Sequence, residues 1–444
     1  MDYLIQFGQL FLGISILVVL HEGGHFFAAK WFKTKVESFY LFFNPWFSIW
    51  KKKIGETTYG IGWLPLGGYV KIAGMIDESM DKEQMAKPPQ PWEFRSKPAW
   101  QRLIIMLGGI IVNVIVGILI YSFVLWGYGD KYLPPSELED GIWCTNEIVA
   151  KDIGLKTGDK ILSINGEVPT TFADMQEDVF YASTIKIERN GEEMDIKIPQ
   201  NLIEKLLENR TGPLFKYRIP FTVGRLGKGY LAEDVGIKLK DDILAINDIE
   251  IKYFDQFTPT ISQFTGQEIE LKIRREGKII SIPLTVPDSN RIGVGFYDYD
   301  MNELDKKGFY KTETLHYSFF ASFPAGYMKA QKKVVKYYQQ FKMMLNPSTG
   351  AYKGMGGFWS ISKIFGAEWN WENFWRKTAW ISLVLAFMNL LPIPALDGGH
   401  VMFLLYEMIT RRKPNEKAME YAQMAGMILL LAFMVYANTD FLRF

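Results

Sequence analysis

The sequence contains very little cysteine and almost no net charge, and both shortages exclude classes of protein. The single cysteine, Cys144, excludes an intramolecular disulfide framework and a zinc site built from several cysteines. Lysine and arginine total 50 against 49 acidic residues, so no overall electrostatic field favours nucleic acid as a partner. Histidine is scarce too, with 4 residues in 444. Chemistry based on imidazole must therefore come from very few positions.

The start of the chain lacks a basic leader before its first apolar run. That run, residues 4–29, is rich in Leu, Ile, Val and Phe, and it carries two histidines and a glutamate. Hydrocarbon tolerates ionisable groups only where they have a task or face a cavity. We therefore expect a retained membrane span that holds a functional site, and not a cleaved signal peptide.

Four apolar segments are long enough to cross a membrane, the third of them with a break: residues 4–29, 103–126, 379–405 and 418–436. Lysine and arginine cluster after the first span, before the second and after the third, and the positive-inside bias places these clusters in the cytoplasm. Both termini and the polar segment 127–378 are then expected outside, which in a bacterial cell is the periplasm. Arg376 and Lys377 are a small contrary signal.

The first span contains the sequence His-Glu-Gly-Gly-His at residues 21–25. On a helix, residues four apart share one face, so His21 and His25 can present ring nitrogens to one metal ion with Glu22 beside it. With so few histidines, composition alone produces such a match roughly a few times in a thousand. The motif therefore predicts zinc on the two histidines and proton transfer by Glu22.

A catalytic zinc site usually has three protein ligands, so the two histidines need a partner. The third span offers Asp397 in the stretch Asn-Leu-Leu-Pro-Ile-Pro-Ala-Leu-Asp-Gly-Gly-His, residues 389–400, where two prolines interrupt an apolar helix. Broken helices are tolerated in lipid only around internal cavities, and a carboxylate oxygen suits Zn²⁺. We expect Asp397 to be the third ligand and His400 to have a supporting or packing role.

The polar segment contains an internal duplication. Residues 149–166 match residues 231–248 at a constant offset of 82. Each copy reads as a turn, a short strand and a hairpin turn, at Asn165 or Asn247, followed by further strand-like runs. The pattern resembles tandem PDZ domains of the bacterial type, whose groove accepts an extended peptide by strand addition. The first copy lacks an obvious glycine-rich loop for a peptide carboxylate, whereas the second has one at residues 223–227.

Residues 323–345 have a helical spacing of lysines against aromatic and apolar side chains. Such an amphipathic helix either lies along the outer membrane surface or packs its apolar stripe on the two repeated modules. The pattern alone leaves both alternatives open.

The two metal-site motifs, placed in the first and third spans, resemble the site-2 protease family (M50) of intramembrane zinc metalloproteases. Four spans with tandem PDZ-like modules between the second and the third resemble its bacterial regulator of sigma-E protease group, and the likeness covers nearly the whole chain. The stretch 66–74 is similar to the family's glycine-rich β-loop that re-enters the membrane beside the site. Gly108, Gly109 and Asn113 are similar to its second-span pattern.

The resemblance implies a set of site residues. Zinc would be held by His21, His25 and Asp397, with Glu22 as the general base. Substrate backbone would be held by Asn389 and by four residues of the β-loop, Gly67, Gly68, Tyr69 and Val70. For the glycine pair the alternative is an ordinary cytoplasmic turn, and for the two asparagines of the spans it is hydrogen bonding between helices.

We therefore expect a multi-pass α-helical membrane protein with four transmembrane helices and two inserted periplasmic PDZ-like α+β domains, in a bacterial inner membrane. The expected division is 1–127 for the first two spans and the β-loop, 128–220 and 221–310 for the PDZ-like domains, 311–375 for an amphipathic linker, and 376–444 for the last two spans. The resemblance implies a Zn²⁺-dependent protease that cuts single-span membrane proteins, such as an anti-sigma factor, and remnant signal peptides. Peptide termini would bind at the PDZ-like domains. These domains would admit to the active site only substrates whose outer domain another protease has already removed.

Two other functions fit parts of the sequence. Intramembrane His and Asp residues beside a broken helix also describe an ion path, so a metal-ion transporter is one alternative. That alternative explains Glu22 and the repeated modules poorly. The other is a membrane-anchored PDZ scaffold in which the metal motifs have no task.

Overall fold

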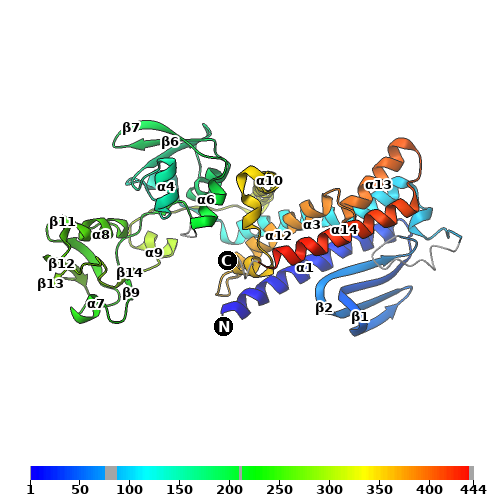
Figure 1. Cartoon of the computed structure of the whole chain (residues 1–444). Coiled ribbons are helices and arrows are strands. Elements are labelled where there is room, and N and C mark those ends of the chain that lie inside the picture. Colours follow the sequence, from blue (N-terminus) through cyan, green and yellow to red (C-terminus); the bar gives the residue numbers. More distant parts are fainter. Residues whose placement is uncertain (1, 76–87, 210–212, 440–444) are drawn as a thin grey trace. The chain divides into compact units, whose positions relative to one another are not determined.

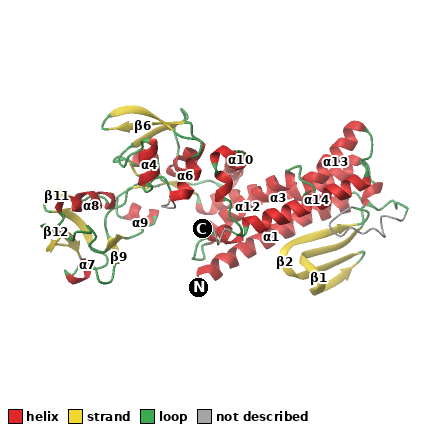
Figure 2. Ribbon diagram, viewed as in Figure 1, coloured by secondary structure: helices red, strands yellow, loops and turns green. Residues whose placement is uncertain are grey.

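The computed structural model describes residues 2–75, 88–209 and 213–439, and the chain divides into two compact units (Figure 1). The helical unit consists of residues 1–130, 316–342 and 355–444, and the strand-rich unit of residues 131–315 and 343–354. Figure 2 shows long helices in the first unit and small sheets in the second. Along the chain, the strand-rich unit is therefore an insertion into the helical unit.

The helical unit is built mainly on α1 (Asp2–Trp31), α3 (Ala99–Tyr128), α12 (Trp371–Leu390), α13 (Asp397–Thr410) and α14 (Glu416–Ala437). Among the described residues, three helical segments are long and apolar enough to cross a membrane: Asp2–Trp31, Ala99–Tyr128 and Lys417–Ala437. They contain the first, second and fourth of the spans predicted from the sequence.

The predicted third span consists of two helices. α12 ends at Leu390 and α13 begins at Asp397, because Pro392 and Pro394 lack the N–H that a helix requires and restrict the residues before them. Ala395 has a φ of +79°, which is uncommon for a residue with a Cβ. α13 has 14 residues and α12 starts with a charged segment, so neither qualifies as a span by itself. A crossing formed by the two helices together stays a prediction.

Helices α1 and α3 approach each other closely at a pair of glycines. A Cβ on Gly24 would overlap the carbonyl oxygen of Gly108, and a Cβ on Gly108 would meet the backbone of Gly24. Small residues allow the backbones of membrane helices to come together, which strengthens their van der Waals packing. This contact brings α3 against the turn of α1 that contains the two histidines.

Strands β1 (Val36–Ile54) and β2 (Thr57–Ile72) follow α1 and form an irregular antiparallel sheet. Tyr40 of β1 lies opposite two separate residues of β2, Gly60 and Tyr69, so β2 runs along both edges of β1. Both glycines of the predicted β-loop lie within β2, and Gly68 pairs with Leu41 of β1. The alternative of an ordinary turn at that pair is therefore wrong.

Helix α10 (Phe319–Leu345) contains the amphipathic segment. Ala330 is buried in a cluster with Tyr121 of α3. Tyr337 packs edge-on against Phe387 of α12, with ring centroids 5.2 Å apart. These contacts are with other helices of the helical unit, a placement that the amphipathic pattern did not indicate.

The strand-rich unit contains two hydrophobic cores, each built mainly from one copy of the duplicated sequence. The first copy supplies α4 (Glu147–Ile153), α5 (Phe172–Asp178) and the sheet β5 (Lys160–Ile164), β6 (Thr184–Arg189) and β7 (Glu192–Lys197). The second supplies α7 (Leu231–Asp234), α8 (Phe254–Ile261) and the sheet β11 (Ile249–Glu250), β10 (Asp242–Ile246), β12 (Glu268–Arg275) and β13 (Lys278–Thr285). Shorter elements of this unit are β3 (Asp130–Tyr132) with β15 (Glu313–Leu315), β4 (Ile142–Trp143) with β8 (Lys216–Tyr217), β9 (Val223–Leu226) with β14 (Val294–Phe296), α6 (Leu202–Asn209) and α9 (Met301–Lys306). The short helix α11 (Phe358–Lys363) belongs to the helical unit.

The two copies share details beyond the order of their strands. Arg189 makes a bidentate ion pair with Asp159 in the first copy, and Arg275 makes the same pair with Asp241 in the second. The asparagine of each predicted hairpin turn has a left-handed φ, +51° in the first copy and +53° in the second, which asparagine tolerates better than most residues. The duplication is thus confirmed at the level of individual turns and ion pairs.

Asp140, which lies in the first module, makes hydrogen bonds to two residues of the second module. Its carboxylate accepts hydrogen bonds from Nζ of Lys252 at 2.5 Å and from the hydroxyl of Tyr253 at 2.7 Å. These two donors hold the pKa of Asp140 below its usual range. Close by, Arg218 forms an ion pair with Asp255 at 2.5 Å.

Replacing Asp140 with asparagine should destabilise the full-length protein at pH 7. A carboxyl group whose pKa is lowered by folding stabilises the folded state above its unfolded pKa of about 3.9, and this contribution is lost as the pH falls through the folded pKa. Because the side chain is 41% exposed, we expect an effect below about 1 kcal/mol. Thermal unfolding between pH 7 and pH 3 measures it, with Asp288→Asn as an exposed control. A deficit that stays constant over this pH range would contradict the assignment.

Candidate metal centre

His21 and His25 lie one turn apart on the same face of α1. Nδ1 of His25 is 2.8 Å from the carbonyl oxygen of Ile105 in α3. A carbonyl oxygen can only accept a hydrogen bond, so this nitrogen carries the proton of the neutral ring. Nε2 of His25 then has a free lone pair, and it lies 3.3 Å from Nε2 of His21.

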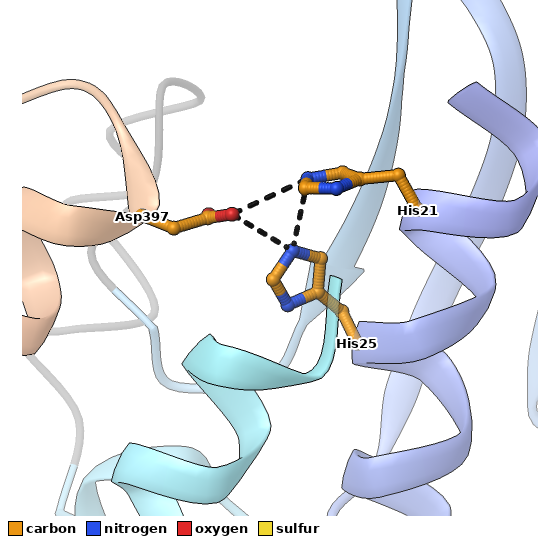
Figure 3. Close-up of side chains that lie close together, drawn as sticks. All are labelled: His21, His25 and Asp397. Atoms are coloured by element: carbon orange, nitrogen blue, oxygen red, sulfur yellow. Dashed lines mark hydrogen bonds and ion pairs between the residues drawn. The ribbon is translucent and has the colours of Figure 1, made fainter. Parts of the chain in front are cut away.

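Asp397 completes the group from a distant part of the chain. It is the first residue of α13, directly after the proline-broken segment, and its Oδ2 atom lies 3.3 Å from Nε2 of each histidine (Figure 3). The three side chains are between 9% and 17% exposed. In the described part of the chain, this is the group of His, Cys, Asp and Glu side chains whose ligand atoms are close enough to share one metal ion. The structure thus brings together the three residues that the sequence predicts as ligands.

The spacing of the three atoms fits Zn²⁺. Nitrogen and oxygen ligands lie about 2.0–2.2 Å from zinc in a tetrahedron, so the ligand atoms are then about 3.3–3.6 Å apart. All three distances between the donor atoms are 3.3 Å. Oδ2 of Asp397 is buried and has no hydrogen-bond donor among the residues that the structure describes. Lone pairs that face one another in a buried site are unfavourable without a cation between them.

A cavity of about 620 Å³ opens beside these side chains. Of the four β2 residues predicted to hold substrate, Gly68, Tyr69 and Val70 line the cavity, whereas Gly67 is not among the described residues that line it. His400 lines the cavity as well, outside the group of three donors. Helix α14 contributes two further lining residues, Gln423 and Met427, which no sequence motif indicated.

Glu22 lies in the wall of this cavity, next to the histidines. The backbone of Val70 hydrogen-bonds to its carboxylate, and a Cβ on Gly68 would be in van der Waals contact with Cγ of Glu22, at 3.5 Å. Asn389, in the last turn of α12, places Nδ2 3.4 Å from Nε2 of His21. The predicted general base and the predicted substrate-binding asparagine therefore both lie beside the predicted metal ligands.

Helix α3 shapes the site from the other side. The carbonyl of Ile105 holds His25, and one turn later Gly109 leaves room for the rings: a Cβ there would be 2.5 Å from Nε2 of His25 and 2.6 Å from Cε1 of His21. A further turn on, Nδ2 of Asn113 lies 3.1 Å from Nδ1 of His21. From the sequence, Gly109 and Asn113 were expected only as part of the family's second-span pattern, with hydrogen bonding between helices as the alternative for Asn113. Their contacts with the two histidines were not predicted, although a spacing of four residues places them on one face of a helix.

Comparison with known proteins identifies the family. A profile of Peptidase family M50 matches residues 9–433 of the chain. The chain belongs to this family. The Regulator of sigma E protease of Haemophilus influenzae is 28% identical over the full length of both proteins. A putative zinc metalloprotease of Treponema pallidum is 26% identical over 95% of this chain and 96% of its own length, and Protease RseP of Yersinia pestis is 26% identical over the full length of both.

Membership of family M50 makes the chain a zinc metalloprotease, and with its long apolar helices it is a membrane protein. The predicted family, enzyme class and cofactor are thus confirmed. Family membership does not assign the zinc ligands or the substrate of this chain, and the geometry of the site bears on both.

Replacing His25 with alanine should remove zinc from the purified protein. Loss of one of three protein ligands leaves the metal too weakly held to survive purification, so we expect about one zinc per chain in the wild type and almost none in the variant. Elemental analysis of protein in detergent gives the ratio. His316→Ala, an exposed histidine outside the group, should keep its zinc. Equal zinc in the His25 variant and the wild type would show that this residue is not a ligand.

Replacing Gly109 with alanine should also weaken zinc binding, because the new methyl group would push both imidazoles away from their positions. We expect a loss of about tenfold or more, comparable to losing an orienting contact at a metal site. Zinc competition with a chelator measures the change. Gly127→Ala in the same helix, where nothing lies within 4 Å of the added Cβ, is the matched control. Similar affinity in the two variants would show that Gly109 has no spacing role.

Proposed function

We propose that this protease hydrolyses peptide bonds within the transmembrane segments of single-span membrane proteins. One observation carries the proposal: the carboxylate of Asp397 meets the imidazoles of His21 and His25 at 3.3 Å, and both histidines belong to a 30-residue apolar helix. A hydrolytic site within such a helix suits a scissile bond that is also in the membrane.

We assign the zinc ligands as Nε2 of His21, Nε2 of His25 and Oδ2 of Asp397. When bound there, zinc supplies Lewis acidity, which lowers the pKa of a water molecule and polarises the scissile carbonyl. Three protein ligands leave one tetrahedral position for water or substrate, which is the pattern of catalytic zinc sites.

Glu22 is the general base of the proposed reaction. Its carboxylate lies in the cavity wall next to the ligands and is oriented by the backbone of Val70. It accepts a proton from the attacking water and then gives that proton to the leaving amine, which is the usual way in which a positioned carboxylate assists amide hydrolysis.

Substrate backbone is held by β2 and by Asn389 in this proposal. The amides of a transmembrane helix are already hydrogen-bonded, so the segment to be cut must unwind and find new partners. Residues 67–70 belong to a strand at the cavity, and an extended segment can add to a strand through main-chain hydrogen bonds. The amide of Asn389, close to His21, supplies a further partner.

The family resemblance and the name of one relative support a substrate class. A Regulator of sigma E protease suggests an anti-sigma factor or a similar single-span protein, and remnant signal peptides are a second class. We propose that the duplicated modules of the strand-rich unit are PDZ-like, lie in the periplasm of an inner-membrane enzyme, and admit substrates that have already lost their outer domain. Their shared turns and ion pairs support a tandem of equal modules.

Replacing Glu22 with glutamine should abolish cleavage and leave zinc in place. The amide cannot accept the proton, so we expect kcat to fall by about 10² to 10⁴ or more, while the three ligands are unchanged. The assay is cleavage of a model single-span substrate by protein reconstituted in lipid vesicles, with elemental analysis in parallel. Glu56→Gln, in the exposed turn between β1 and β2, is the matched control. Full cleavage by the Glu22 variant would exclude this residue as the base, and loss of zinc would assign it to metal binding.

A further inference from the structure

Asn113 is a buried polar residue of α3 that contacts a metal-site histidine. It is 0% exposed, and its Nδ2 atom lies 3.1 Å from Nδ1 of His21. Its Oδ1 atom is also buried and meets no hydrogen-bond donor within the described ranges of the chain. A buried acceptor without a donor is costly, so this amide orientation is unfavourable on its own account.

The same orientation also conflicts with metal binding. If Asn113 donates an N–H to Nδ1 of His21, the proton of the neutral ring must be on Nε2, and a protonated Nε2 cannot bind zinc. Yet Nε2 is the atom of this ring that faces His25 and Asp397. Rotating the amide of Asn113 by half a turn exchanges its oxygen and nitrogen, which have nearly the same shape. Oδ1 then faces Nδ1 and accepts its proton, so Oδ1 gains a donor and Nε2 of His21 keeps its lone pair.

We propose that Asn113 is a positioning residue whose Oδ1 accepts a hydrogen bond from Nδ1–H of His21, which keeps Nε2 of that ring free and directed at the metal. The inference rests on the ligand set proposed above. Histidines that bind metals usually give their other N–H to a carbonyl or carboxylate oxygen, which fixes both the tautomer and the orientation of the ring. The carbonyl of Ile105 already has this relation to His25 at 2.8 Å.

The spacing along α3 supports this role. Ile105, Gly109 and Asn113 are four residues apart, so one face of the helix presents an acceptor for His25, a gap for both rings and an acceptor for His21. Ser382 of α12 donates a hydrogen bond to the backbone carbonyl of Asn113 at 2.7 Å, a contact that leaves the amide side chain of Asn113 to His21. Helix α3 therefore orients both imidazoles without providing a ligand of its own.

The test is the zinc affinity of the full-length protein in detergent, measured by competition with a chromophoric chelator. Asn113→Leu has a similar size and no polar atom, so we expect zinc affinity to fall by about 10- to 100-fold. Asn113→Asp keeps an acceptor oxygen and has no N–H, so we expect affinity within about threefold of the wild type. Asn113→Ala repeats the loss of the amide with a smaller side chain, in case the leucine variant does not fold. Ser382→Ala, which touches the same turn of α3 and does not contact His21, is the control and should bind zinc like the wild type.

Two results would overturn the inference. Equal losses in the aspartate and leucine variants would show that Asn113 acts through its N–H, and undiminished affinity in the leucine and alanine variants would show that it does not orient the ring. A wrong ligand set would give a different result. If His21 is not a zinc ligand, the His21→Ala variant binds zinc as tightly as the wild type, whatever residue is at position 113.

Discussion

Three atoms with free lone pairs, each 3.3 Å from the other two in a site closed to most solvent, are the constraint on which the rest of the helical unit depends. Such an arrangement is unfavourable without a cation and favourable with one, because a buried charge needs a partner within a few ångströms. Two of the donors come from α1 and the third from α13, about 370 residues later. Under the proposed ligand set, zinc binding and the correct packing of these helices are coupled.

Two local features make this packing possible: a contact between glycines and a break between two helices. The backbone contact between Gly24 and Gly108 brings α3 close enough for its Ile105 carbonyl to hold His25. The break between α12 and α13 lets the chain deliver a carboxylate at the start of a helix, within reach of both histidines. Glycine and proline, which usually weaken helices, are here the residues that allow two helices to bring their donor atoms to one proposed metal site.

Much of the site could be predicted from the sequence because its signals are local. The spacing of His21 and His25 fixes their common face, and the two prolines mark the segment that carries Asp397. The duplication was visible as matching turns. Other features depend on tertiary packing and leave no local signal: the face of α3 that orients the rings, the lining of the cavity by α14, and the contacts of α10 with α3 and α12. The break in the third span was expected, but the apolar run did not show how short the helix after it would be.

The most direct test of the account is the position of the metal in an experimental structure of the zinc-loaded protein, located by anomalous scattering at the zinc edge. If these three residues hold the zinc, one peak is expected about 2.0–2.2 Å from Nε2 of His21, Nε2 of His25 and a carboxylate oxygen of Asp397. A zinc ion bound elsewhere in the chain, or one coordinated without Asp397, would contradict it.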